Sequence, residues 1–502
     1  MTDPNQTRRD FAKKLAAGAA AAALGSSASQ AADAPKTNVL QTAEQGGAGR
    51  TLPPHRLTSG SISTNAKIFN EAAREVPVAG SSDIVVCGGG PAGIAAALAA
   101  ARSGANVRLL EVNGCIGGVW TAGGLSLVID LGNKQGIMRE LRLELEKRSW
   151  GHFSPNGSFV YDAEMMKVLL EEMLVEAGVA IQLHTRVVAA LKDDENRVSA
   201  VVSESKSGRQ TWLGKMFVDC TGDGDLAALA GCQFDVGNAE TGATQPMSLM
   251  GLIVGPKLDE IAQFVNHVAS NRGLGRAKTN LLAEMRRAGV DPSYHGPTIF
   301  CVRDGMYAMM ANHQYNVSAT DAAQVTQATL EARREVHRLV DALRKAGGVW
   351  KDLYLVTTAE QIGTREGRRI RGLYSVRLDD LAKGATFDDP VCQVRFGIDM
   401  HSTDPTNNKE IEKKPVKSKP YEIPLRSMIA ADVDGLMMAG RCISGDFFAH
   451  SSYRVTGNAV AMGEAAGVVA ALAASRKQLP QQVPFGDIAP KLPYTADRTR
   501  KS

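Results

Sequence analysis

Apolar and polar positions along the chain predict a strand, a tight turn, a helix and a second strand in quick succession. Residues 82–87 form a short apolar run bounded by polar residues, which is typical of a buried strand. A glycine-rich turn follows at once, and residues 94–101 are rich in alanine, as in a helix. The apolar run 107–110 predicts a second strand that ends at Glu111. Two strands joined by a helix are the unit from which parallel sheets are built.

Later stretches carry similar signals. Residues 215–220 and 434–439 are apolar runs that each lead into a glycine turn, and both predict buried strands. The alanine-rich run 459–474 predicts a helix. Apolar residues at helical spacing predict another helix over 321–346, namely Ala322, Val325, Leu330, Val336, Leu339, Val340 and Leu343. The region 236–424 lacks nucleotide-binding signals, and we expect a cap or substrate domain of mixed helix and strand there.

The N-terminus has the order of an export signal. Arg8 and Arg9 precede an apolar, alanine-rich run at 15–24, and small residues follow at 28–31. The arginine pair and the modest hydrophobicity resemble a twin-arginine signal, so we expect residues 1–31 to be a signal peptide and the protein to be periplasmic or otherwise exported by that route. An alanine-rich helix and an uncleaved anchor are the alternatives. Residues 32–80 predict a linker or arm, and no other apolar run is long enough for a transmembrane span.

Composition narrows the class of protein. The chain has 502 residues, of which 44% are hydrophobic and 22% charged, and its formal net charge is +4. This indicates more than one domain and no nucleic-acid-binding surface. The seven cysteines are scattered and form no CxxC pair, so the sequence predicts no iron–sulfur centre, c-type haem, disulfide framework or metal site. If the protein takes part in electron transfer, its electron donor or acceptor is therefore expected to be a separate molecule.

The turn between the first two strands carries a dinucleotide-binding motif. Gly88 permits the tight turn, Gly90 lets the backbone approach a pyrophosphate, and Gly93 lets the helix pack close to the strand. Pro91 and Ala92 form the helix start, whose free N–H groups attract phosphate. The Glu at the end of the second strand, Glu111, is placed to accept hydrogen bonds from ribose hydroxyls.

These motifs resemble those of FAD-dependent oxidoreductases. The segment 111–124 is similar to the stretch that continues the FAD site after the second strand, and 215–225 resembles the second FAD fingerprint. The segment 434–441 resembles the last strand of the FAD domain. A single GxGxxG unit argues against a second nucleotide domain for NAD(P)H. The resemblance implies FAD as the cofactor, with further contacts from Gly117, Gly118, Val187, Thr221, Gly222, Asp223 and Gly440.

A late motif, 450–459, resembles an element of fumarate reductase-type flavoproteins. In that element an arginine holds a substrate carboxylate beside the flavin, and the next helix points its N-terminus at the flavin. The resemblance makes Arg454 the first catalytic candidate and His450 the second, and it places Asn458 and Ala459 at the cofactor.

Two further candidates lie in the predicted cap. Arg365 belongs to a basic run and would clamp an anionic substrate or a flavin phosphate, although a structural ion-pair role is equally open. His313 is weaker, because a lone histidine is more often structural.

Departures from the family pattern change two expectations. Ser451 and Tyr453 replace a Gly and an Asn, so we expect a substrate other than a simple dicarboxylate. Histidyl-linked members of the family carry a histidine near residues 117–120, where this chain has none. The sequence therefore predicts non-covalent FAD, with attachment through Cys115 as the alternative.

Together these patterns predict an α/β fold, with a discontinuous Rossmann-type FAD-binding domain and an inserted α+β cap. The predicted function is hydride transfer between FAD and a small molecule, and an anionic substrate is considered. The enzyme would be a dehydrogenase or a reductase. A separate electron carrier or quinone would be the partner, and the oligomeric state is left open. A flavin monooxygenase or halogenase, and a flavin-bearing binding protein without turnover, are the alternatives. The predicted boundaries are 81–235 and 425–475 for the FAD domain, 236–424 for the cap and 476–502 for a C-terminal tail.

Overall fold

The computed structural model describes residues 73–154, 158–266, 274–406 and 409–496. The predicted signal peptide, 1–31, and nearly all of the predicted linker lie outside these residues. Strand β1 (Val78–Cys87) begins inside the range assigned to the linker, because Val78 already pairs with the long strand β9 (Gly208–Asp219). The sheet therefore starts earlier than predicted.

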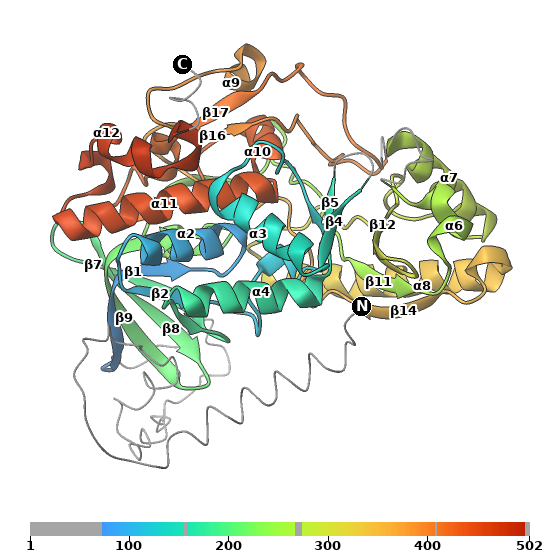
Figure 1. Cartoon of the computed structure of the whole chain (residues 1–502), viewed down its shortest axis with the longest axis horizontal. Helices are drawn as coiled ribbons and strands as arrows, with labels where there is room; N and C mark the ends of the chain where they lie inside the picture. The colour runs from blue at the N-terminus through green and yellow to red at the C-terminus, as the bar shows by residue number, and fades with distance from the viewer. Residues whose placement is uncertain (1–72, 155–157, 267–273, 407–408, 497–502) are drawn as a thin grey trace, which may run out of the picture. The chain divides into compact units, whose positions relative to one another are not determined.

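A seven-stranded sheet forms the centre of the nucleotide-binding unit (Figure 1). β1, β2, β6, β9 and β18 run parallel, whereas β8 pairs antiparallel with β9, and β7 pairs antiparallel with β8. The apolar run from Ile84 to Cys87 is completely buried, as in a parallel strand covered on both faces. This confirms the predicted α/β architecture. The strand order is β6 (Ala180–Gln182), β2 (Val107–Leu110), β1, β9, β8 (Val198–Ser205) and β7 (Arg186–Lys192), with β18 (Leu436–Met438) paired to the end of β9.

Two helices pack side by side against this sheet, α2 (Pro91–Arg102) and α11 (Thr456–Arg476) (Figure 1). A Cβ on Gly463 would lie 2.0 Å from the carbonyl oxygen of Ala92, and one on Gly467 would lie 2.2 Å from that of Ala96. Glycine therefore lets the two backbones approach closely. Among the described residues, α11 is the one helix long and apolar enough for a membrane span, and 83% of its apolar window is buried inside the protein. Its apolar character thus fits a core helix.

A second sheet and three helices build a separate hydrophobic core, which is the α+β cap. All neighbouring strands of this sheet are antiparallel. Helix α8 (Ala322–Ala346) agrees with the predicted helix, and the Asp321 side chain caps it by accepting the N–H groups of Ala323 and Gln324. The other elements are β12 (Thr298–Arg303), β13 (Met306–Met310), β11 (Gly251–Val254), β14 (Tyr354–Thr358), α6 (Leu258–Ile261) and α7 (Leu274–Arg287), with strand order β12-β13-β11-β14.

The predicted cap range 236–424 divides between the two cores. Buried side chains from Ile253 to Leu353 form the cap core, whereas those from Ile370 to Leu425 join the core of the large sheet. The chain thus returns to the first core well before residue 425. The returning elements are β15 (Arg369–Ile370), α9 (Leu378–Lys383), β16 (Pro390–Val394), β17 (Tyr421–Pro424) and η5 (Leu425–Met428).

The remaining elements complete this scaffold. The predicted tail from 476 packs onto it, since Val483, Ile488 and Leu492 lie in the first core. These elements are η2 (Gly118–Trp120), β3 (Leu127–Val128), α3 (Gly136–Lys147), β4 (Gly151–Phe153), β5 (Phe159–Tyr161), α4 (Ala163–Glu176), α5 (Asp225–Leu229), β10 (Phe234–Asp235), η3 (Ala262–Phe264), η4 (Gly348–Trp350), α10 (Phe447–Tyr453), η6 (Pro480–Gln482), α12 (Phe485–Ile488) and η7 (Ala489–Lys491).

Candidate active site

Three glycines shape the turn from β1 into α2. Gly88 has a φ of +99°, and a Cβ there would lie 2.4 Å from the carbonyl oxygen of Cys220. A Cβ on Gly93 would lie 1.8 Å from the carbonyl oxygen of Gly88, so only glycine lets α2 pack this close to the strand end. No described atom lies within 4 Å of a Cβ built on Gly90. Gly88 thus lies in the tight turn, Gly93 at the close contact between helix and strand, and Gly90 beside open space. The motif predicts these three positions.

Two helix starts converge beside this turn. No described side chain caps α2 or α11, and neither helix has an acidic residue in its first turn. Both starts meet at Gly440, where a Cβ would lie 3.2 Å from the Cβ of Ala92 and 3.9 Å from that of Ala459. Free N–H groups and the helix dipole attract negative charge at such ends. The convergence therefore favours a phosphate-bearing ligand.

Glu111 follows β2 and faces the same turn. Its carboxylate accepts hydrogen bonds from the Gly89 N–H and from the Asn113 N–H, the latter at 2.8 Å. Burial raises its pKa, although these backbone donors act in the opposite direction. Each carboxylate oxygen keeps a second lone pair for a ribose hydroxyl.

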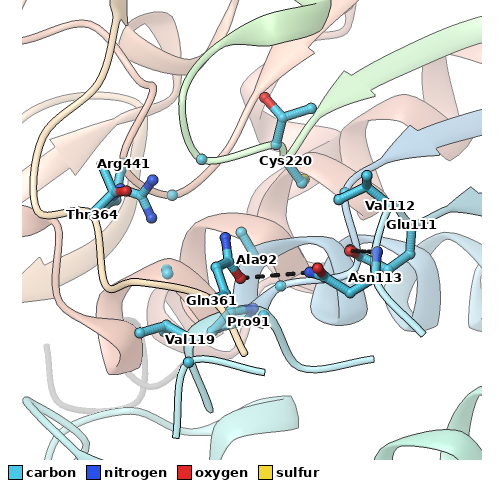
Figure 2. Close-up of a pocket in the computed structure, with 18 of the residues that line it drawn as sticks. Pro91, Ala92, Glu111, Val112, Asn113, Val119, Cys220, Gln361, Thr364 and Arg441 are labelled. Carbon is cyan, nitrogen blue, oxygen red and sulfur yellow. Dashed lines mark hydrogen bonds between the residues drawn. The ribbon is translucent and has the colours of Figure 1, made fainter. Parts of the chain in front are cut away.

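These elements line one cleft, which contains about 1090 Å³ of space, part of it open to solvent. In Figure 2, Glu111, Val112 and Asn113 lie at one end of the cleft, and Thr364 and Arg441 lie at the other. Segments far apart in the sequence therefore meet at one site. Most of the predicted cofactor-binding residues line it, namely Gly88, Gly90, Pro91, Ala92, Glu111, Gly118, Val187, Thr221, Gly222, Gly440 and Ala459.

The other predicted cofactor-binding residues lie behind the cleft wall. Gly117 has a φ of +118° and donates its N–H to the carbonyl oxygen of Gly89 at 2.8 Å. Asp223 accepts a hydrogen bond of 2.6 Å from Arg441 and thereby holds this guanidinium at the cleft. These residues position the wall but are not part of it. The predicted cofactor-binding residues that do not line the cleft are Gly93, Gly117, Asp223 and Asn458.

Several lining residues were missed from the sequence. Arg441 and Thr456 lie inside the quoted late motifs, next to residues that were selected, and both line the cleft. Asn113 and Gln361 join two walls of the cleft through a hydrogen bond of 3.5 Å from the Asn113 amide to the Gln361 carbonyl (Figure 2). Adjacency to a motif was the available signal for Arg441, Thr456 and Asn113, whereas nothing in the sequence pairs Gln361 with Asn113.

Arg454, the first catalytic candidate, lines the cleft just before α11. Its Nη2 donates to the main-chain carbonyl of Asp399 at 2.9 Å and to the Asp399 carboxylate at 3.2 Å. Its buried Nε, the buried Nε2 of Gln245 and the hydroxyl of Thr456 have no hydrogen-bond partner among the described residues. Buried polar groups normally have a partner, so this end of the cleft favours a polar ligand.

The other catalytic candidates do not reach the cleft. His450 is completely buried in α10, and burial with the nearby Arg369, Arg454 and Arg441 holds its pKa well below the ordinary value. Arg365 is 8% exposed, and its guanidinium donates to the Pro246 carbonyl at 2.6 Å and to the Ser248 hydroxyl at 2.9 Å. Both assignments therefore need correction, because motif spacing does not fix the direction in which a side chain points.

The two departures from the family motif also face the core. Ser451 and Tyr453 are completely buried, and the Tyr453 hydroxyl donates to the Ile443 carbonyl at 3.1 Å. These substitutions therefore change packing behind the site, and they carry no direct information about the substrate.

A buried polar cluster behind Arg454 was not assembled from the sequence. The Nδ1 of His401 lies 3.0 Å from the Nε2 of His313, and its Nε2 lies 3.5 Å from the Asp399 carboxylate. The Nδ1 of His313 lies 3.1 Å from the Tyr315 hydroxyl, and the ring of Tyr294 stacks on His313 with centroids 4.1 Å apart. Of these residues, sequence reasoning had noticed only His313.

Burial and neighbouring charges keep both imidazoles neutral. Burial, then Arg365, lowers the pKa of His401 to about 4. Burial, Arg365, His401 and Lys278 hold the pKa of His313 well below its usual value. Burial alone would raise the pKa of the Asp399 carboxyl, but His401 and the arginines hold it well below its usual value. The cluster is thus a carboxylate beside two neutral rings at neutral pH.

Comparison with protein families decides what this cleft binds. The model of the FAD dependent oxidoreductase family matches residues 83–492. The chain belongs to this family. It is therefore an oxidoreductase with FAD as its cofactor, as the sequence predicted, and its sheet is the predicted Rossmann-type FAD-binding fold. The cleft fits FAD, because it offers open space at Gly90, two helix starts and the Glu111 carboxylate.

Three solved structures resemble this FAD-dependent oxidoreductase distantly. The flavin-dependent brominase Bmp2 is 13% identical over 81% of this chain and 82% of that chain, with a TM-score of 0.43. The myxobacterial chondrochloren halogenase CndH is 14% identical over 82% and 79%, with a TM-score of 0.42. A geranylgeranyl bacteriochlorophyll reductase-like protein of Thermoplasma acidophilum is 13% identical over 84% and 83%, with a TM-score of 0.40. None of the curated proteins searched matches the chain.

Proposed function

We propose that this oxidoreductase transfers a hydride between non-covalent FAD and a small anionic molecule, and exchanges electrons with a separate carrier or quinone. The observation that carries the proposal is the Arg454 end of the cleft, where the buried Nε of Arg454 and the buried hydroxyl of Thr456 have no partner among the described residues and both residues line the cleft. A carboxylate or another oxyanion would accept these hydrogen bonds. The resemblance of 450–459 to fumarate reductase-type flavoproteins supports the same role for Arg454.

The cofactor would occupy the remainder of the cleft. The start of α2 would face the pyrophosphate and Glu111 would bind a ribose. The uncapped start of α11 would stabilise negative charge on the reduced flavin. Bound FAD supplies the acceptor or donor of the hydride. The residues of the chain bind and orient the substrate and hold its proton.

Buried positive charge supports an anionic substrate. Arg365 lowers the pKa of both buried histidines, Arg454 also lowers that of His401, and Lys278 also lowers that of His313. Asp399 is the carboxylate in direct contact with Arg454. Because buried charge is costly without a counter-charge, an entering anion would stabilise this region.

The proposal of non-covalent FAD is supported by the position of Cys115. Its side chain is buried beside the Thr121 hydroxyl and does not line the cleft, and burial raises the pKa of the thiol. Acid precipitation of the purified protein tests this point. FAD released into the supernatant is the expected result, and yellow colour retained in the pellet would overturn the proposal.

Anaerobic mixing tests the reaction. The FAD-loaded protein is mixed with small hydroxy, keto and unsaturated carboxylic acids, in the oxidised form and after reduction by dithionite. We expect one acid to bleach or restore the visible flavin absorption, and Arg454→Gln to abolish this while keeping bound FAD. Oxygen-dependent hydroxylation or halogenation of an added substrate would replace the proposal with the monooxygenase or halogenase alternative.

We also propose that the protein is exported by the twin-arginine route. The support is the sequence of residues 1–31, with Arg8 and Arg9 before the apolar run. Expression in a bacterium and fractionation test the proposal. The protein is expected in the periplasmic fraction with FAD bound, whereas the variant with Arg8→Lys and Arg9→Lys stays in the cytoplasm. Equal export of both would contradict it.

A further inference from the structure

We propose that Asp399, His401, His313 and Tyr315 form a proton relay that joins the Arg454 end of the cleft to the surface of the cap. The inference rests on the proposed function. Oxidation of a substrate there sends a hydride, with both electrons, to FAD, and the substrate also releases one proton. That proton needs an acceptor close to the substrate, and reduction by the same site needs a proton donor there.

The contacts of these residues form a continuous chain. Arg454 lines the cleft and donates to the Asp399 carboxylate at 3.2 Å. The same carboxylate oxygen lies 3.5 Å from the Nε2 of His401. The two imidazoles meet at 3.0 Å, and the far nitrogen of His313 lies 3.1 Å from the Tyr315 hydroxyl.

One arrangement of protons satisfies every contact with neutral rings. His401 carries its proton on Nε2 and donates to Asp399, so its Nδ1 accepts from the Nε2–H of His313. The Nδ1 of His313 then accepts from the Tyr315 hydroxyl. Each imidazole has one N–H and one lone pair, and each is used once.

A second arrangement holds one proton more than the first, and Asp399 carries that proton. It forms when the Tyr315 proton passes to the Nδ1 of His313, the Nε2–H of His313 passes to the Nδ1 of His401, and the Nε2–H of His401 passes to Asp399, while Tyr315 takes a proton from water. Asp399 then donates to the Nε2 of His401, the His401 Nδ1–H donates to His313, and the His313 Nδ1–H donates to Tyr315. The Tyr315 hydroxyl then donates to the Ser293 carbonyl, which lies 3.1 Å away. No group loses a partner in the change. The reverse shift passes the proton of Asp399 along the chain, releases one proton from Tyr315 to water and restores the first arrangement. The chain can thus take up a proton for reduction, and it can release one after oxidation when the rings hold their protons on Nδ1 before the substrate proton reaches Asp399.

The two ends of the chain lie where a relay requires them. Asp399 is 23% exposed at its side chain and contacts the cleft residue Arg454. At the other end, Tyr315 is half-buried and precedes the exposed Asn316, whereas His313 and His401 are buried. A proton that reaches Tyr315 can therefore pass to water at the cap surface.

The charged and titratable groups around the two imidazole rings favour the passage of a proton over its retention on a ring. Arg365 and Arg454 face His401, while Arg365 and Lys278 of α7 face His313. Asp399 is the carboxylate that faces His401, and Glu335 of α8 accepts the N–H and the hydroxyl of Ser293 and faces Tyr315. Tyr294 covers one face of His313, and its hydroxyl lies 3.4 Å from Lys278. The cations disfavour a charged imidazole, so neither ring retains the proton.

Hydrogen exchange tests the relay without a substrate. The FAD-loaded full chain is prepared with isotope-labelled histidine, and NMR measures how fast the imidazole N–H protons of His313 and His401 exchange with water. The signals are assigned with His313→Gln and His401→Gln. We expect Tyr315→Phe to slow the exchange of both rings at least about tenfold, which corresponds to a barrier higher by ~1.4 kcal/mol.

Tyr294→Phe is the matched control, because it removes a hydroxyl that touches the cluster but lies outside the chain. It should leave the exchange rates unchanged. His313→Gln is the second test, since an amide fills the position without passing a proton, and it should slow exchange at His401. Unchanged exchange in Tyr315→Phe, or equal slowing in Tyr294→Phe, would overturn the relay. A failed screen for substrates would affect the proposed function alone.

Discussion

The cofactor side of the cleft and the Arg454 side are built in different ways. On the cofactor side, Gly88, Gly90 and Gly93 lie in one turn and act through backbone groups and the absence of side chains. On the Arg454 side, Gln245 and Asp399 reach Arg454 from distant segments, and the contacts join charged or polar side chains. The first side is therefore sensitive to added volume, and the second is sensitive to lost charge or a lost donor.

Gly93→Ala breaks the cofactor side most severely. Its Cβ would lie 1.8 Å from the Gly88 carbonyl oxygen, and α2 has no room to shift because Gly463 and Gly467 already bring α11 against its backbone. Overpacking usually costs about 1–3 kcal/mol, and here we expect the upper end of that range or a failure to fold. Denaturant unfolding measures the effect. Stability equal to that of the parent protein would show that backbone contact does not set this turn.

Arg454→Gln is the corresponding test of the other side. The change removes the charge that faces the cleft and leaves Asp399 without its arginine partner. We expect kcat/KM to fall by about 10²–10³-fold, the size typical of a lost charge-stabilising donor, while FAD stays bound. Arg454→Lys is the control, because it keeps the charge but loses the planar guanidinium. Its kcat/KM should lie between that of the parent protein and that of Arg454→Gln. Loss of FAD together with activity would contradict the division into two sides.

The strands, the helix and the glycine turn of the cofactor side could be predicted because their signals lie close together in the sequence. The strands, the glycine turn and Glu111 lie within a single βαβ unit, so spacing alone carried the geometry. The late helix was also found, although it begins at Thr456, earlier than its alanine-rich run. Both helix starts lie at the cleft as expected.

The Arg454 side could not be predicted in the same way. His401 contacts His313 across 88 positions of sequence, and no local pattern pairs them. Arg365 and His450 were selected for their type and their neighbours, but both are buried and neither lines the cleft. Long-range side-chain contacts depend on where the returning segment after Ile370 packs, and composition does not reveal that.

Changes of pH should act with opposite sign on the Arg454 side of the cleft and on helix α11, which packs against α2. The pKa of His401 is lowered from 6.5 to about 4 in the folded chain. Between these two pH values the unfolded chain therefore binds a proton more readily than the folded chain does. The contribution of His401 to stability is present above pH 6.5 and is lost as the pH falls toward 4. The loss is at most ~1.4 kcal/mol per pH unit. Unfolding measured from pH 4 to 8 should show a smaller acid loss in His401→Gln than in the parent protein.

Glu464 on α11 should behave in the reverse way. Burial raises its pKa from 4.5 to about 7, so the folded chain binds the proton more readily between these values. Its contribution is present below pH 4.5 and is lost as the pH rises through 7. Glu464→Gln keeps the side-chain oxygen that accepts the Ile137 N–H at 3.2 Å, so it should remove this alkaline loss. A pH profile identical to that of the parent protein would show that the carboxyl is not buried as described.

Gly90→Ala gives the smallest change and the sharpest test of where the cofactor lies. The backbone there has φ −74° and ψ −174°, which alanine adopts freely, and no described atom lies within 4 Å of the new Cβ. The free energy of unfolding without FAD should therefore stay within about 0.5 kcal/mol of the parent value. The methyl group instead enters the space that the pyrophosphate would occupy, so the affinity for FAD should fall at least about tenfold, or ~1.4 kcal/mol. Titration of the apoprotein with FAD measures this. Because Gly93→Ala fails through contact with the protein and Gly90→Ala only through contact with the ligand, full affinity in Gly90→Ala would place FAD elsewhere in the cleft.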